Sequence, residues 1–358
     1  MNYFYFPPLV IVAMLNTMAG IGGGALLFPI YYLLADYTIQ ESVLLSVMGV
    51  VGTAFIRTIY YVGLRDLIKY RILRSIIPFD AAMAAYGFIL NLILPNWLTL
   101  IFICLILTTV LFKTCHKTRQ IRLQELKIIN VNTARAPVTN IQQNSCMNRE
   151  WRSFRANIKY LLPYLILIVG QNLLSKYFDD FCSYKYWLFV VGFSIANLAV
   201  GYYFLPNINN LEIKLRNKLI FFGANTGWIS SLLGIGGGML INPLLLYYNF
   251  SPEEIVATGS MIALFSGLSS ALQYIFSDDV KVTTIDLFLS FLVGIVGAVL
   301  GMIVVTKCFK RKSLILIILL LLILSSFILI VTFTTIDIAD NGFDGFQNLC
   351  NTTEHSVE

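Results

Sequence analysis

The chain has few charged residues and almost no histidine. Only 12% of its 358 residues are Asp, Glu, Lys or Arg, which is about half the share found in a soluble domain. The two histidines, His116 and His355, lie outside the apolar runs. These runs therefore hold no His, Cys and carboxylate cluster for a metal, and an intramembrane serine protease would lack its histidine base. We predict no metal, no cofactor and no enzymatic activity.

Paired cysteine motifs and nucleotide-binding loops are missing as well. The six cysteines include no CxxC pair, so the sequence predicts neither a disulfide framework nor a zinc site. No GxxxxGK[ST] motif is present, which leaves an ATP-driven pump without support.

Apolar sequence is what the chain has in abundance. Hydrophobic residues make up 58% of it, and the mean hydropathy is +0.77. Several runs exceed about 18 mostly apolar residues, without the period-two alternation of a membrane barrel. We therefore predict an all-α polytopic membrane protein that crosses the lipid bilayer with about 8–10 segments.

One unusual motif occurs twice, once in each half of the chain. GIGGG at residues 20–24 is followed by Pro29, and GIGGG at residues 234–238 is followed at the same spacing by Pro243. Each glycine costs a helix about 1 kcal/mol, and in lipid a broken helix survives only where its freed backbone groups face protein, water or a ligand. A duplicated broken segment predicts the binding site of a transporter. The alternative is that the glycines only allow close helix packing.

The repeat divides the chain into five regions. They are residues 1–112, the first membrane repeat; 113–159, a basic loop; 160–218, two middle membrane segments; 219–335, the second membrane repeat; and 336–358, a polar acidic tail. The loop has ten Lys or Arg and two acids, so we expect it to be cytoplasmic and not a nucleic-acid site. We expect its middle, residues 130–148, to be disordered.

Two topologies are compatible with the two glycine-broken segments. If each segment crosses the membrane once, the basic cluster at Lys307–Lys312 falls outside, against the positive-inside tendency. If each segment re-enters and leaves on its own side, every basic cluster falls inside and the two halves are inverted. We favour the second topology.

Several carboxylates have simple structural interpretations. Thr38 to Glu41 and Ser251 to Glu254 follow the capping-box pattern S/T-x-x-E, which explains the two glutamates without a role in proton coupling. Asp80 and Asp286 lie near the ends of predicted spans, and we expect both at the membrane interface.

Small polar residues beside the glycines suggest an anion site. A helix N-terminus carries about +0.5 charge and free N–H donors. Arg57, alone inside a span, could attract an anion or extend to the interface. The alternative for the hydroxyls is bonding to their own helix. The predicted substrate-binding residues are Asn16, Thr17, Gly20, Gly22, Gly23, Gly24, Pro29, Arg57, Thr226, Ser230, Ser231, Gly234, Gly236, Gly237, Gly238, Asn242, Pro243, Thr258 and Ser260.

With the stretch Ala257-Thr258-Gly259-Ser260 and the Gly/Ala-rich spans, the duplicated motif resembles the sulfite exporter TauE/SafE family over residues 16–112 and 219–333. The resemblance implies a multi-pass transporter of sulfite, sulfonates or related organosulfur anions. We predict a secondary transporter that works by alternating access, with proton or ion coupling as an open alternative. A second hypothesis is a non-transporting scaffold or receptor that acts through the basic loop. The sequence carries no signal for an oligomeric state.

Overall fold

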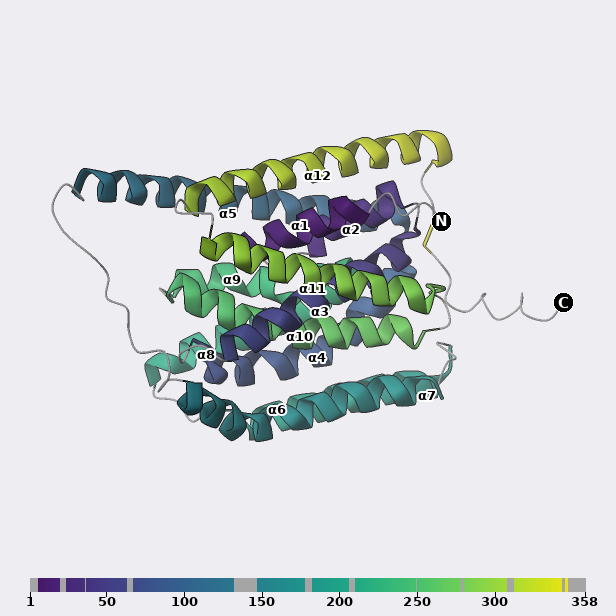
Figure 1. Ribbon diagram of the computed structural model, residues 1–358. Helices are drawn as coiled ribbons and strands as arrows, with labels where there is room; N and C mark the ends of the chain where they lie inside the picture. The colour runs from purple at the N-terminus through teal and green to yellow at the C-terminus, as the bar shows by residue number, and fades with distance from the viewer. Residues whose placement is uncertain are drawn as a thin grey trace.

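The computed structural model describes residues 6–19, 24–35, 37–62, 67–131, 147–177, 182–205, 210–248, 250–277, 280–307, 312–342 and 345–346. These residues form α-helices and no strand (Figure 1). The helices are α1 (Phe6–Ala19), α2 (Gly24–Leu34), α3 (Ile39–Val62), α4 (Tyr70–Ile93), α5 (Asn96–Val131), α6 (Met147–Ser175), α7 (Tyr184–Tyr203), α8 (Asn210–Leu233), α9 (Gly237–Tyr247), α10 (Pro252–Ile275), α11 (Thr284–Lys307) and α12 (Lys312–Asn341). The predicted all-α class is confirmed.

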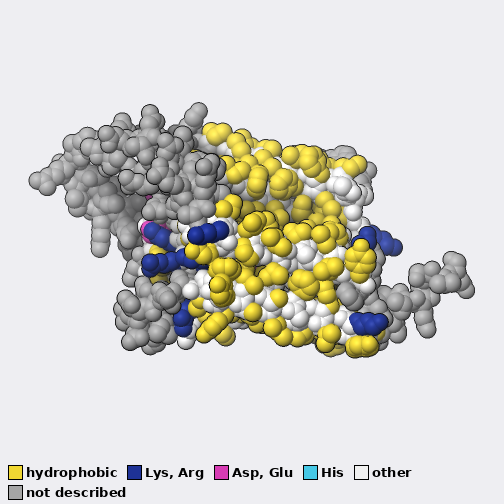
Figure 2. Space-filling view, turned by 90° about the horizontal axis from the view of Figure 1, so that it is seen from below, with side chains coloured by type: hydrophobic (Ala, Val, Ile, Leu, Met, Phe, Trp, Pro, Cys, Tyr) yellow, Lys and Arg dark blue, Asp and Glu magenta, His cyan; other side chains and the backbone are white. Residues whose placement is uncertain are grey.

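Within the described residues, six helices are long and apolar enough to cross a membrane: α3, α4, α6, α7, α10 and α11. Figure 2 shows the flank between their ends covered with hydrophobic side chains, while Lys and Arg gather at the two ends. Apolar side chains such as Ile166 and Leu188 are exposed on this flank, where lipid would contact them. The chain is therefore an integral, multi-pass membrane protein.

The two repeats interlock rather than sit side by side. The central helices α3 and α10 pack against each other. Helix α4 of the first repeat packs against α8 and α10 of the second, and α11 of the second packs against α1 and α3 of the first. Helices α5 and α12 pair on one flank, and α6 and α7 pair on the opposite flank beside α4 (Figure 1).

The offset between the two glycine motifs extends to the helix boundaries. Helix α4 begins at Tyr70 and α11 at Thr284, while α1 ends at Ala19 and α8 at Leu233, so both pairs of helices keep this offset. Helices α4 and α11 are also equally long, at 24 residues each. The second half therefore reproduces the helix pattern of the first, as expected from the duplicated motif.

Helices extend beyond the apolar runs that predicted them. Helix α5 continues to Val131, α6 begins at Met147 and α8 begins at Asn210. Leu, Lys, Arg, Gln and Glu favour a helix whether or not they lie in lipid, so hydropathy alone does not mark a helix end. Most of the stretch predicted to be disordered, residues 132–146 of 130–148, lies outside the described residues.

Among the described cysteines, Cys104 and Cys115 are free and Cys182 is disulfide-bonded. No motif in the sequence indicated this bond, because a CxxC spacing reveals only local pairs.

Close contact between α3 and α11 depends on glycine. A Cβ added to Gly52 would collide with the carbonyl oxygen of Phe291 and lie 3.3 Å from the Cα of Gly294. Both of these neighbours are backbone atoms, which cannot move aside as a flexible side chain can. The two helices therefore approach to backbone contact at this point.

We expect Gly52→Ala to lower the stability of the protein by about 1–3 kcal/mol, because the methyl group must push two helices apart. Gly192→Ala is the matched control, since nothing lies within 4 Å of a Cβ there; it should be neutral or gain about 0.5–1 kcal/mol from helix propensity. Thermal unfolding of the purified proteins in detergent measures both. Equal unfolding temperatures for the two variants would contradict the close contact.

Candidate functional site

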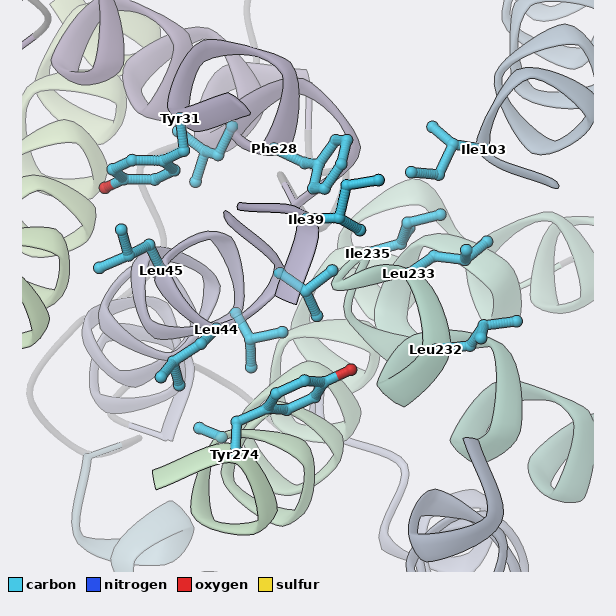
Figure 3. Close-up of a cluster of buried hydrophobic side chains, with 14 of the residues drawn as sticks. Phe28, Tyr31, Ile39, Leu44, Leu45, Ile103, Leu232, Leu233, Ile235 and Tyr274 are labelled. Atoms are coloured by element: carbon cyan, nitrogen blue, oxygen red, sulfur yellow. The ribbon is translucent and has the colours of Figure 1, made fainter. Parts of the chain in front are cut away.

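The second glycine motif interrupts a helix, as predicted. Helix α8 ends at Leu233 and α9 begins at Gly237. Gly234 and Gly236 have φ of +68° and +77°, in the left-handed region that glycine enters without steric cost. Ile235 between them is fully buried, and Figure 3 shows it in the hydrophobic cluster that also holds Leu233. The break is thus a defined turn, anchored by one apolar side chain.

The first motif meets the second. Helix α1 ends at Ala19 and α2 begins at Gly24, and Gly20, Gly22 and Gly23 lie outside the described residues. A Cβ added to Gly24 would collide with the carbonyl oxygen of Gly234 and lie 2.8 Å from the Cα of Ile235. Two segments from opposite halves of the chain therefore touch, backbone to backbone.

Contacts with neighbouring helices give the directions of the helices on either side of each break. Helix α8 runs parallel to α4, and α9 then runs antiparallel to α10. Likewise α1 runs parallel to α11, while α2 runs back along the same helix. The contacting pairs are Gly223 with Ile76, Trp228 with Gly87, Gly237 with Ser266, Asn242 with Gly259, Ala13 with Gly297, Thr17 with Gly301, and Tyr31 with Ser290.

Side chains from other helices donate hydrogen bonds to carbonyl groups at and just after the end of α8. The hydroxyl of Tyr274 on α10 donates to the Ser231 oxygen at 2.8 Å. The Nδ2 of Asn91 on α4 donates to the Leu232 oxygen at 2.7 Å. The Oγ of Ser46 on α3 lies 3.1 Å from the Gly234 oxygen and 2.8 Å from the Val43 oxygen of its own helix, so its one proton is shared between them. A helix end leaves four carbonyls without partners in its own helix, and here much of that deficit is made good by tertiary contacts.

The backbone N–H groups on the other side of the break, at the start of α9, lack such partners among the described residues. Within the described part of the chain, the backbone N–H groups of Gly237 and Gly238, at the start of α9, have no hydrogen-bond acceptor. A helix start presents such donors together with about +0.5 charge. The break therefore combines paired acceptors with open donors, an arrangement that suits an anion.

Asp80 lies beside these open donors. Its side chain is 2% exposed near the middle of α4, and its Oδ1 would lie 3.2 Å from a Cβ on Gly237. The expectation of an interfacial Asp80 is wrong, because α4 begins at Tyr70, two turns before the apolar run that predicted the span. Asp286 does lie near a helix end, where Thr283 Oγ1 donates to its Oδ2 at 2.6 Å.

Comparison with known proteins places the chain in a family. The sequence model of the sulfite exporter TauE/SafE family matches residues 5–144 and again residues 140–329. The chain belongs to the sulfite exporter TauE/SafE family.

Relatives of the chain carry the same family name or a related one. It is 26% identical over 401 aligned positions to sulfite exporter TauE/SafE family protein 1 of Arabidopsis thaliana, covering 96% of this chain and 88% of that protein. Family protein 5 of the same plant is 24% identical, over 92% and 82%. The probable membrane transporter protein YunE of Bacillus subtilis is 32% identical over 26% of this chain and 37% of its own. No solved structure matches the chain.

Several predicted binding residues of this TauE/SafE protein do lie at the glycine breaks. Ser230 and Ser231, near the end of α8, are fully buried; Ser230 accepts from Ser266 at 3.0 Å, and Ser231 bonds the Gln273 amide at 3.3 Å. The others that line or flank the described parts of the breaks are Gly24, Thr226, Gly234, Gly236, Gly237 and Gly238. Asn16 is buried near the end of α1, and Pro29 is buried inside α2.

Two predicted hydroxyl residues bond within their own helices. Thr17 donates to Ala13 O and Ser260 to Val256 O, each four residues back. Asn242 of α9 instead contacts Gly259 of α10, and Pro243 lies in α9.

Two further predicted residues join the start of α10 to the first repeat. Thr258 of α10 accepts from the Lys69 N–H, just before α4, at 3.0 Å. Arg57 of α3 donates to Val256 O of α10 at 3.5 Å, so both contacts lie away from the turn at Gly234–Gly236.

Sequence reasoning missed Ser46, Asn91, Tyr274 and Ser266, which reach the break from α3, α4 and α10. Nothing in their local sequence marks them, since a buried polar residue also bonds its own helix. Asp80 did carry a signal, because an ionisable residue inside a span predicts a functional site. Both capping boxes are confirmed, with Thr38 and Glu41 bonded reciprocally and Ser251 and Glu254 likewise.

We expect Tyr274→Phe to destabilise the protein by about 1–3 kcal/mol, because it leaves the buried Ser231 carbonyl without its partner. Tyr202→Phe is the control, since Tyr202 is 80% exposed, and should change stability by less than about 0.5 kcal/mol. Chemical or thermal unfolding in detergent tests the pair. A Tyr274→Phe protein as stable as the control would show that the hydroxyl does not support the break.

Proposed function

We propose that this TauE/SafE protein is a secondary transporter of a small sulfur-containing anion, either sulfite or a sulfonate, which binds at the start of α9. The observation that supports the proposal is the difference between the bonded carbonyl groups and the open N–H groups at the Gly234–Gly236 break. Tertiary contacts satisfy carbonyl groups at the end of α8, whereas the N–H groups of Gly237 and Gly238 remain open in the described structure. An oxyanion is the ligand that accepts from such donors.

The family name supports the substrate class. Sulfite and sulfonates present three oxygens around one sulfur, so they can accept from several N–H groups at once. A site built from backbone donors compensates the charge only in part. Such a site can therefore release the anion as well as bind it, which transport requires.

We infer that the transporter works by alternating access. The contact between Gly24 and Gly234 supports this inference, because movement of one repeat against the other would separate the two breaks. We infer that each broken segment is re-entrant and that the two repeats are inverted, because α9 and α2 each run back toward the side from which α8 and α1 came. Interlocked α4 and α11 would transmit movement of one repeat to the break of the other.

We infer that the end carrying the 113–159 loop faces the cytoplasm. Lys and Arg concentrate in that loop, as the positive-inside tendency requires. Cys182, between α6 and α7 at the opposite end of the spans, is disulfide-bonded. Disulfides persist in oxidising compartments, which is consistent with that end facing away from the cytoplasm.

The transport proposal predicts that Gly236→Leu lowers sulfite uptake about tenfold or more, because a branched residue at positive φ carries about 1–3 kcal/mol of strain. Its Cβ would also lie 2.8 Å from Val50 Cγ1. Gly192→Leu, on the exposed face of α7, is the control and should transport normally. The assay is uptake of radiolabelled sulfite by proteoliposomes, with sulfate and ethanesulfonate as competitors. Wild-type protein that carries neither sulfite nor ethanesulfonate would refute the proposal.

The orientation predicts opposite accessibility for two cysteines. In sealed vesicles with the extracytoplasmic face outward, an impermeant maleimide should label Cys182 only after reduction by an impermeant phosphine. The free, exposed Cys115 should be labelled only after permeabilisation, because it lies beyond the membrane on the cytoplasmic side. Mass spectrometry of the peptides reads both sites. Labelling of Cys115 in sealed vesicles would reverse the assignment.

A further inference from the structure

A buried carboxylate lies against the proposed anion site, and the proposed function gives it no task. We propose that Asp80 takes up one proton in each transport cycle, so that proton and anion bind together at the start of α9. This inference rests on the proposed function and adds the coupling ion to it.

The position of Asp80 is the first argument. The side chain is 2% exposed, in a helix whose apolar span is 72% buried within the protein. Burying a charge without a partner is costly, and an ionisable residue within a membrane span is by default a functional hypothesis. A carboxylate here therefore requires an explanation beyond packing.

The surroundings of the carboxylate are the second argument. Its Oδ1 has no hydrogen-bond partner in the described structure. The hydroxyls of Thr226 on α8 and Ser266 on α10 are hydrogen-bonding neighbours of the carboxylate, but both groups are neutral and each also bonds another oxygen. Thr226 donates to Gly223 O at 2.7 Å, and Ser266 donates to Ser230 Oγ at 3.0 Å.

No charged group of the described residues balances Asp80. Among the helices packed on α4, the facing groups are the hydroxyls on α8 and α10. On α7, Ser194 donates to the Ala82 oxygen. The titratable Tyr164 of α6 lies near Arg74, almost two turns before Asp80 on α4. A proton is thus the simplest partner for the ionised carboxylate.

The location of Oδ1 beside Gly237 is the third argument. An ionised Asp80 and a substrate anion would repel each other across the start of α9, and only one negative charge is accommodated well by its donors. Protonation removes the repulsion and turns the carboxylate into a neutral hydrogen-bond donor. The anion then binds beside the neutral acid.

The proton balance of the cycle is simple. One proton from water on the side of uptake bonds Oδ1, and one anion binds. After the breaks separate toward the other side, the anion leaves and the O–H bond releases its proton to water there. The carboxylate is restored, and one proton has accompanied one anion.

The coupling site belongs to one break only. By the offset between the two glycine motifs, the position in the second repeat that corresponds to Asp80 is Gly294, which contacts Gly49 O on α3. The two repeats thus share a fold but not this carboxylate, so one such residue sets one proton per cycle.

The test compares two modes of transport in proteoliposomes that hold the full chain. Radiolabelled sulfite is used, with the membrane potential clamped by potassium and valinomycin and with leak through protein-free liposomes subtracted. An imposed gradient of one pH unit should support about tenfold accumulation by the wild type, because one proton per anion converts that gradient directly. Asp80→Asn should lose this accumulation and fall to about onefold, while sulfite counterflow remains measurable, since the amide imitates the protonated acid.

Asp286→Asn is the matched control. Asp286 is also buried, but its carboxylate is bonded to Thr283, so the pH-driven accumulation should match the wild type. Asp80→Asn protein that still accumulates sulfite tenfold would overturn the coupling role and leave the proposed transport intact. Wild-type protein without sulfite transport would instead refute the proposed function itself.

A second measurement uses the wild-type protein, in case Asp80→Asn fails to fold. Dicyclohexylcarbodiimide reacts with protonated carboxyl groups in apolar surroundings. Peptide mapping should find Asp80 modified, more slowly at alkaline pH and more slowly with sulfite present. No modification of Asp80 at any pH, or modification unaffected by sulfite, would contradict a shared proton and anion site.

Discussion

The whole architecture depends on one constraint: backbone groups buried away from water need partners. At the Gly234–Gly236 turn, the interruption of a helix exposes carbonyl and N–H groups inside the protein. Three helices supply donors to the carbonyls through Tyr274, Asn91 and Ser46. The open donors at the start of α9 are what remain, and the proposed anion site is built on them.

Helices of one repeat pack at the break of the other and supply side chains to it. Helix α4 is part of the first repeat by sequence, yet it lines the break of the second and brings Asn91 and Asp80 to it. A repeat that moved alone would lose these contacts. Each break therefore packs against a helix of the opposite repeat. Under the proposed mechanism, movement at one break would displace the helices that contact the other.

Polar side chains in the spans divide into two groups with different consequences. Thr17, Thr53 and Ser260 donate to carbonyls of their own helices and contribute little to the site. Ser266 and Tyr274 instead donate across helices. Membrane interhelical bonds of this kind are worth roughly 0.6 kcal/mol each on average, so several acting together are needed to hold a turn at a fixed place.

The amino-acid sequence by itself determined the all-helical class, the two repeats, the position of the second break and both capping boxes. Each of these depends on local composition: apolar length, adjacent glycines, or the spacing of Ser251 and Glu254. Tertiary structure alone decided that the two breaks touch, that Asp80 is buried beside Gly237, and that Cys182 is disulfide-bonded. These relations join residues far apart in the chain, and no local propensity encodes which helix lies opposite another.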